Sequence, residues 1–231
     1  MSNKSQTTDQ LTHTELTLTP AGHSLHPPAR RPRRTDAQAN EELILAAAQQ
    51  LFAAHGVESV TMSAIAAAAG LGKGTLYRAF ANKGELCLAL MDDDLRRFQE
   101  ETLQLLAARR TMPTLDLLAD FLDRLVFFMA HHAGLMCEAD AHGALNGRAE
   151  VNQTSLHDWF HTTVTLLLRQ AMHETALPPE TDIAYLADAI LALFNPKLLR
   201  HQLQVDQRDP AAISQHLRRF VMTGISGQSR G

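Results

Sequence analysis

Apolar residues recur along most of this chain at spacings of three and four, the pattern of helices that bury one face. No stretch alternates between apolar and polar residues like a half-buried strand, and no internal repeat is present. Gly and Pro residues separate the periodic segments. The pattern predicts an all-α protein with helices at about 41–55, 83–109, 114–132, 150–175, 181–195 and 210–224, and two short helices between residues 61 and 80.

The two short helices are the most informative part of the chain. An apolar stripe predicts a buried face for the first helix, and Gly70 permits the sharp turn that ends it. The second helix begins near Gly72 and buries Leu76 and Phe80. Its open face then carries Lys73, Thr75, Tyr77 and Arg78. This arrangement predicts a helix-turn-helix whose second helix enters the major groove of DNA.

At these residues the chain resembles the TetR family of bacterial transcriptional regulators. The resemblance lies within 41–86 and departs from the usual form at Gly72, where a Ser often caps the helix, and at Ala79, which lacks the usual His or Tyr ring. It implies a three-helix DNA-binding head followed by a larger helical domain for ligand binding and dimerisation. The matching residues are Thr61, Ile65-Ala66, Ala69-Gly70, Lys73-Gly74-Thr75-Leu76-Tyr77, Phe80, Lys83, Glu85 and Leu86.

The side chains of this segment differ in the DNA groups they suit. Hydroxyl and ammonium donors at Thr61, Tyr77 and Lys83 suit phosphate oxygens. Lys73 and Arg78 could donate to guanine edges, and the Thr75 methyl could touch a thymine methyl. Gly74 would let the helix approach the duplex closely, unless it only weakens the helix, and Tyr77 could instead belong to the core. The candidate DNA contacts are Arg33, Arg34, Thr61, Ser63, Lys73, Gly74, Thr75, Tyr77, Arg78 and Lys83.

Charge is unevenly distributed along a chain whose formal net charge is −4. Residues 29–86 hold seven basic and five acidic groups, whereas 87–231 hold 13 basic and 18 acidic groups. The basic run at 30–34 precedes the first helix, where a flexible arm could follow phosphates or enter a minor groove, although it could also be only solvated charge. We expect a disordered arm at 1–35, a DNA-binding domain at 36–86 and a ligand-sensing and dimerisation domain at 87–231.

Two apolar segments of the larger part, 117–136 and 156–172, could line a ligand pocket between helices. The alternative for each of these residues is ordinary core, because aromatic and Met stripes at helical spacing are what a core requires. The candidate pocket residues are Phe121, Leu125, Phe128, Met129, Trp159, Phe160 and Val164.

Segments 181–195 and 210–224 are the predicted interface of a homodimer, since the first carries a broad apolar face edged by alanines. A symmetric pair of recognition helices about 34–36 Å apart predicts a near-palindromic operator. The reading is a DNA-binding regulator, a repressor that a small-molecule effector releases from a double-stranded operator. An activator of the same family and a non-specific architectural DNA binder are the alternatives.

Other functions have less support in the sequence. No apolar run reaches membrane length and no secretion signal is present, so we expect a cytoplasmic protein. No nucleophile elbow, P-loop or metalloprotease motif indicates an enzyme. No cofactor or metal is expected. His157 and His161 lie four residues apart and His131, His132 and His142 could add ligands, but no familiar spacing is complete. Cys87 and Cys137 are expected to be free thiols, and Cys137 has no neighbouring cation to activate it as a sensor.

Overall fold

The computed structural model describes residues 34–146 and 155–227, and within these ranges every regular element is helical. None of the described helices combines the length and apolar character needed to cross a membrane. The elements are α1 (Arg34–His55), α2 (Met62–Ala68), α3 (Lys73–Ala79), α4 (Lys83–Ala108), α5 (Thr114–His131), α6 (Ala133–Ala141), the 3-10 turn η1 (Ala144–Asn146), α7 (Leu156–His173), α8 (Ile183–Ala192), α9 (Pro196–Gln204) and α10 (Pro210–Gly227).

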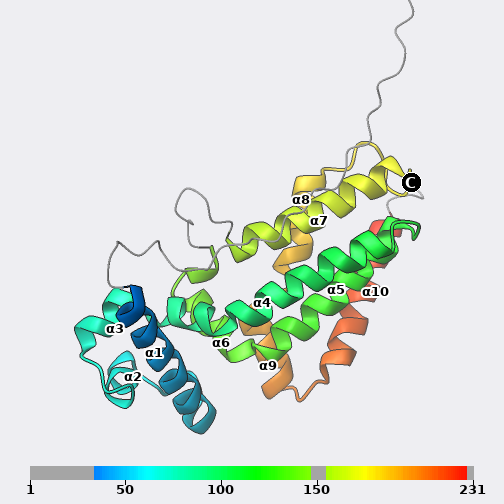
Figure 1. The fold of residues 1–231 in the computed structure, drawn as a ribbon. Helices are drawn as coiled ribbons and strands as arrows, with labels where there is room; N and C mark the ends of the chain where they lie inside the picture. The colour runs from blue at the N-terminus through cyan, green and yellow to red at the C-terminus, as the bar shows by residue number, and fades with distance from the viewer. Residues whose placement is uncertain (1–33, 147–154, 228–231) are drawn as a thin grey trace, which may run out of the picture.

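Helices α1, α2 and α3 form a small head at one end of the molecule (Figure 1). They share a core in which Ile44 and Ala48 of α1 meet Ile65 of α2 and Leu76 of α3, and all four are inaccessible to solvent. Small alanine side chains on α2 let these short helices pack closely. The head therefore has its own core, and the helices within it hold one another in place.

Helix α4 leaves the head and continues, without a break, through the larger domain (Figure 1). Its start is fixed by a reciprocal cap. The Asn82 side chain accepts a hydrogen bond from Glu85 N at 3.0 Å, and the Glu85 carboxylate accepts one from Ala81 N at 2.8 Å. The 26 residues of α4 correspond to about 39 Å of helix, so one rigid element spans both parts of the protein.

The body is a helical bundle whose centre is aromatic. The Phe98 ring on α4 lies 4.8 Å from the Phe128 ring on α5 and 6.1 Å from Trp159 on α7, centroid to centroid. Helix α10 lies along α5 and is held there by Asp123, which accepts hydrogen bonds from Ser214 at 2.6 Å and Arg218 at 2.7 Å. Helix α8 packs on α7, and α9 packs on α6 and α5.

Two helices were absent from the sequence prediction, namely α6 and α9. Gly134 is one of the glycines between the predicted helices, but it lies in the first turn of α6. Pro196 was interpreted as a break, but it is the first residue of α9. Proline suits that position because its missing N–H has no partner in the first turn anyway, and Asn195 caps the backbone N–H groups of Lys197 and Leu198. Helix α1 begins earlier than predicted, at Arg34 rather than 41.

Candidate nucleic-acid interface and effector cavity

The turn between α2 and α3 has the geometry that a helix-turn-helix requires. Thr61 caps α2, since its hydroxyl accepts a hydrogen bond from Ala64 N at 3.2 Å. Gly70 has a φ of +68°, a left-handed conformation that side chains other than glycine rarely tolerate. Gly72 then caps α3 without a side-chain hydrogen bond, which leaves the first amide groups of α3 free of a side-chain acceptor. The chain thus turns within a few residues and starts a second helix.

Helix α3 has one buried face and one open face. Leu76 is inaccessible, and Phe80 just after the helix is 1% exposed. On the opposite side, Lys73, Gly74, Tyr77 and Arg78 are exposed and Thr75 is partly exposed. Tyr77 retains 50% of its surface, so it does not take the core position considered as an alternative. The structure therefore brings five of the candidate DNA contacts onto one solvent-facing surface.

Arg78 lies against its own helix. Its Nε donates to the Gly74 carbonyl oxygen at 3.1 Å, and its Nη2 lies within 3.4 Å of the Thr75 hydroxyl. The guanidinium keeps further N–H donors that these contacts do not use, because it has five. Arg78 is in this way held beside Gly74 and Thr75, with donors left for a base edge or a phosphate.

Gly74 has open space around it. A Cβ built at this position meets no atom within 4 Å, so no packing inside the protein requires a glycine. Thr61 is exposed and Ser63 is partly exposed at the start of α2, on the same head as α3. Two further candidates lie outside the part of the chain whose side chains are described, namely Arg33 and Arg34.

Lys83 is separated from the other candidates, because its side chain is turned into the protein. The residue is 8% exposed, and its ammonium lies 3.5 Å from Glu138 Oε1 of α6 and 5.9 Å from the centre of the Phe52 ring of α1. It also donates to the Glu58 carbonyl oxygen at 3.5 Å. In this conformation the ammonium faces the junction between head and body, and phosphate anchoring would require it to rotate outward.

The same junction holds one more ion pair and two close approaches of the backbone. Arg200 of α9 forms an ion pair and hydrogen bond with Glu58, which follows α1. A Cβ on Gly134 would contact Val57 at 3.4 Å. A Cβ on Gly84, in the first turn of α4, would lie only 2.7 Å from the His142 Cβ, closer than real Cβ atoms approach. The head and the start of α4 therefore rest on α6, on the residues that follow α6, and on α9. Helices α6 and α9 are the two that the sequence did not predict.

The body contains a cavity of about 260 Å³ between α5, α6, α7 and α8. Its wall is mainly apolar, with four polar residues: Asp140, His157, Asp188 and Asn195. Lys197 pairs with Asp140 at 3.3 Å and His161 pairs with Asp188 at 3.2 Å. The apolar lining residues are Met129, Met136, Leu145, Leu156, Phe160, Leu191, Ala192, Phe194 and Pro196.

The candidate pocket residues divide between this wall and the core. Met129 and Phe160 line the 260 Å³ cavity. Phe128 lines a second depression beside α4, described below. The other four do not line either hollow and are buried in the core: Phe121, Leu125, Trp159 and Val164. The acidic and amide groups of the wall were missed, because they come from α6, α8 and the residue before α9, which only the fold brings together.

Both thiols are buried and neither is activated. Burial raises the pKa of Cys87 to about 12, and the carboxylate of Glu138 adds to the rise while Lys83 opposes it. Burial also raises the pKa of Cys137, against a smaller opposing effect of Arg200. Since the thiolate is the reactive form, this geometry gives no support to Cys137 as an oxidant sensor.

An all-helical chain with an exposed recognition helix on a three-helix head, and with a cavity in a helical body, defines a helix-turn-helix protein of two parts. Residues 44–90 match the family model described as bacterial regulatory proteins, tetR family. An HTH-type transcriptional regulator of Staphylococcus aureus strain bovine RF122 / ET3-1 is 43% identical over 65 residues, which are 28% of this chain and 35% of that protein. The head of this chain is therefore similar to the DNA-binding segment of TetR-family regulators.

Solved structures extend the likeness to the body. Thermus thermophilus FadR, a TetR family transcriptional repressor in complex with lauroyl-CoA, aligns with a TM-score of 0.60 and 20% identity, over 80% of this chain and 94% of that one. Bacillus subtilis FadR in complex with stearoyl-CoA aligns with a TM-score of 0.57 and 18% identity, over 80% and 98%. At these identities the likeness establishes the fold of the body and leaves its ligand open. The chain spans about a third of the length of the Staphylococcus aureus regulator that it matches.

Proposed function

We propose that the protein is a ligand-responsive transcriptional repressor that binds a near-palindromic DNA operator as a homodimer. The observation that carries the proposal is the open face of α3, where Lys73, Gly74, Tyr77 and Arg78 are exposed opposite Leu76. Donors of this kind on a short helix suit phosphates and base edges in a major groove. The matched family model and the regulators it describes support the same function.

Dimerisation would use the outer faces of α8 and α10. On α8, Ile183, Ala187 and Ile190 are buried within the chain, whereas Tyr185 is 73% exposed. On α10, Phe220 is 68% exposed. Each of these exposed aromatic side chains would lose this exposure against a second copy. The interface would therefore use the Tyr185 and Phe220 faces, rather than the full apolar stripe of 181–195 expected from the sequence.

Effector binding would act on DNA through the junction of α4 with α6. Helix α6 contributes Met136 and Asp140 to the cavity wall, and it contributes Glu138 to the contact with Lys83 at the start of α4. A ligand that shifts α6 would favour a different position of the head. By thermodynamic linkage it would weaken DNA binding by the ratio of its affinities for the two positions.

The cavity favours a compact apolar effector with a hydrogen-bond donor or a positive charge. Its volume of about 260 Å³ is small, and its wall includes the carboxylates of Asp140, which pairs with Lys197, and of Asp188, which pairs with His161. Carboxylates attract donors and repel anions. The acyl-CoA ligands of the two FadR proteins carry a long chain and a phosphate-rich end, which this cavity does not suit in either size or charge.

The DNA-binding proposal is tested by selecting duplexes from a random library with the full chain and then measuring binding to the enriched sequence. We expect a near-palindromic site and a marked preference over random duplex. Lys73→Ala should weaken this binding, while Arg110→Ala, in the exposed turn that follows α4, serves as the matched control. Equal affinity for selected and random duplex would overturn the repressor and favour an architectural binder.

The effector class is tested with three probes of similar size, phenethylamine, phenethyl alcohol and phenylpropionate, together with lauroyl-CoA. Calorimetry should show the order amine, alcohol, carboxylate, and Asp188→Asn should weaken amine binding with Glu180→Gln as an exposed acidic control. Addition of the amine should also reduce operator binding. Preference for phenylpropionate or lauroyl-CoA would contradict the charge argument without affecting the DNA-binding result.

A further inference from the structure

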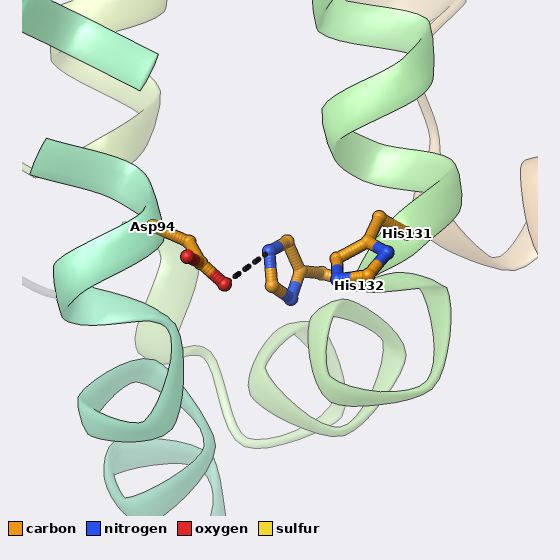
Figure 2. Close-up of side chains that lie close together, drawn as sticks. All are labelled: Asp94, His131 and His132. Atoms are coloured by element: carbon orange, nitrogen blue, oxygen red, sulfur yellow. Dashed lines mark ion pairs between the residues drawn. The ribbon is translucent and has the colours of Figure 1, made fainter. Parts of the chain in front are cut away.

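A second hollow, of about 380 Å³, lies beside α4 where α5 ends, away from the effector cavity. It contains three side chains whose donor atoms lie within 4.8 Å of one another: Asp94 of α4, His131 at the end of α5 and His132 between α5 and α6. Figure 2 shows Asp94 facing the two imidazole rings, with a dashed line to His132. Among the described residues this is the only such group of three His, Cys, Asp or Glu side chains.

We propose that Asp94, His131 and His132 bind a divalent transition-metal ion, such as Zn²⁺ or Co²⁺. Two imidazole nitrogens and one carboxylate oxygen form a donor set that suits borderline metals, whereas Mg²⁺ and Ca²⁺ prefer oxygen ligands throughout. Three protein ligands leave a further coordination position for water or for a small molecule. Because metal–ligand bonds of about 2.0–2.2 Å need donors closer together than here, the exposed His131 ring would move inward on binding.

The surroundings prepare these side chains for a metal. Asp94 Oδ2 lies 3.4 Å from His132 Nε2, while its Oδ1 lies 3.4 Å from an Arg97 guanidinium nitrogen. One carboxylate oxygen is thus held by Arg97 and the other faces the histidine, an arrangement in which an outer partner orients a ligand.

The two acidic and two basic side chains of the hollow balance one another. Arg97 is matched by Asp94, and Arg124 is matched by Glu101, whose carboxylate accepts a hydrogen bond from it at 2.7 Å. Phe127 and Phe128 supply the apolar part of the wall. The other histidine pair, His157 and His161, stacks at 6.2 Å, but it belongs to no group of three with metal-ligand geometry in the described part of the chain. The proposed metal therefore has a distinct location and joins α4 to the start of α6.

The test is metal titration of the full chain after treatment with a chelator. Co²⁺ binding is followed by its visible absorption, and Zn²⁺ affinity is measured by competition with a chromophoric chelator. We expect one site per chain whose affinity falls at least about tenfold in His131→Ala and in Asp94→Asn. His157→Ala is the matched control and should leave the affinity unchanged.

Three results decide the proposal. Loss of the site in both His131→Ala and Asp94→Asn supports it, provided that the metal-free variants keep the circular dichroism of the original chain. Unchanged Zn²⁺ affinity in either variant overturns it. Binding of Mg²⁺ as tightly as Zn²⁺ also overturns it, because that preference would indicate an oxygen site elsewhere. The test does not depend on DNA binding, so the metal site and the proposed repressor function can fail separately.

Discussion

The ammonium of Lys83 lies 3.5 Å from the carboxylate of Glu138, and this contact joins the first turn of α4 to α6. Both side chains are largely buried, with 10% and 15% of their surfaces exposed. Removing one partner would leave the other charge poorly solvated. We expect Lys83→Met and Glu138→Gln each to lower the free energy of unfolding, and the double variant to show a coupling energy of about 0.5–3 kcal/mol. Strictly additive effects in denaturant titrations would indicate that the two charges do not interact.

The salt dependence of operator binding separates Lys73 from Lys83. Lys73 is exposed on α3, so Lys73→Ala should reduce the slope of log affinity against log salt by about 1 if it neutralises a phosphate. The sequence predicts the same reduction for Lys83→Ala. The inward position of Lys83 instead predicts weaker binding with an unchanged slope, because the head would be less well held. A reduced slope for Lys83→Ala would show that its ammonium turns outward on DNA.

Two glycines should respond to alanine in opposite ways. At Gly84 an added methyl would meet His142 Cβ at 2.7 Å and Ala144 Cβ at 3.2 Å, so Gly84→Ala should destabilise the protein by about 1–3 kcal/mol. At Gly74 nothing lies within 4 Å, so Gly74→Ala should raise stability by up to about 1 kcal/mol.

Operator binding gives the second measurement on these variants. If α3 approaches the duplex closely at Gly74, the added methyl should lower the affinity by about tenfold, equivalent to about 1.4 kcal/mol. A Gly74→Ala protein that is more stable and binds DNA unchanged would show that this glycine has no part in the approach.

Stability should decrease as the pH falls toward 6, partly through His132. Burial lowers the folded-state pKa of this histidine below 6.5, His131 lowers it further, and Asp94 opposes the shift. On acidification the unfolded chain therefore takes up a proton at His132 more readily than the folded chain does. The contribution of the neutral His132 to the free energy of unfolding is complete above the unfolded pKa and is lost as the pH falls below it. Thermal melts from pH 8 to pH 5.5 should show a shallower decline for His132→Gln than for the original chain. Parallel declines would exclude His132 as the source.

The two cysteines should be unreactive in the folded protein. With the pKa of Cys87 raised to about 12, almost none of this residue is thiolate at pH 8, and burial also lowers the thiolate fraction of Cys137. Iodoacetamide at this pH should label neither residue in the native protein and both in urea, as mass spectrometry of peptides would show. Rapid native labelling of Cys137 would mean that its surroundings open in solution.

The sequence predicted the head well because its information is local. The turn at Gly70, the cap at Asn82 and the apolar positions of α3 lie within a short segment, and each has a conformational reason for its residue type. The start of α9 was harder to predict. A proline such as Pro196 breaks a helix when it lies in the interior but is well suited to the first helical position.

Long-range contacts could not be predicted from spacing. The sequence predicts that Lys83 faces a phosphate. The structure pairs it with Glu138 instead, and this partner could not be predicted because it lies on a helix that is distant along the chain and that the sequence did not indicate. The grouping of Asp94 with His131 and His132 was hidden for the same reason, whereas the spacing of His157 and His161 was visible. Met129 and Phe160 were placed among the cavity candidates, but only packing separates a cavity wall from core.

Because α4 passes from head to body without a loop, the orientation of the DNA-reading surface depends on the number of residues in that helix as well as on the contacts of the head with α6 and α9. One residue inserted midway would turn the head by about 100° relative to the body, and the two heads of the proposed dimer would then face away from a common duplex. Seven inserted residues would restore the direction to within about 20° but would move each head about 10 Å outward. Insertions and deletions in α4 therefore change both the direction in which the head faces and its distance from the body. The helix is unbroken from Lys83 to Ala108, so it holds no flexible segment that could absorb either change.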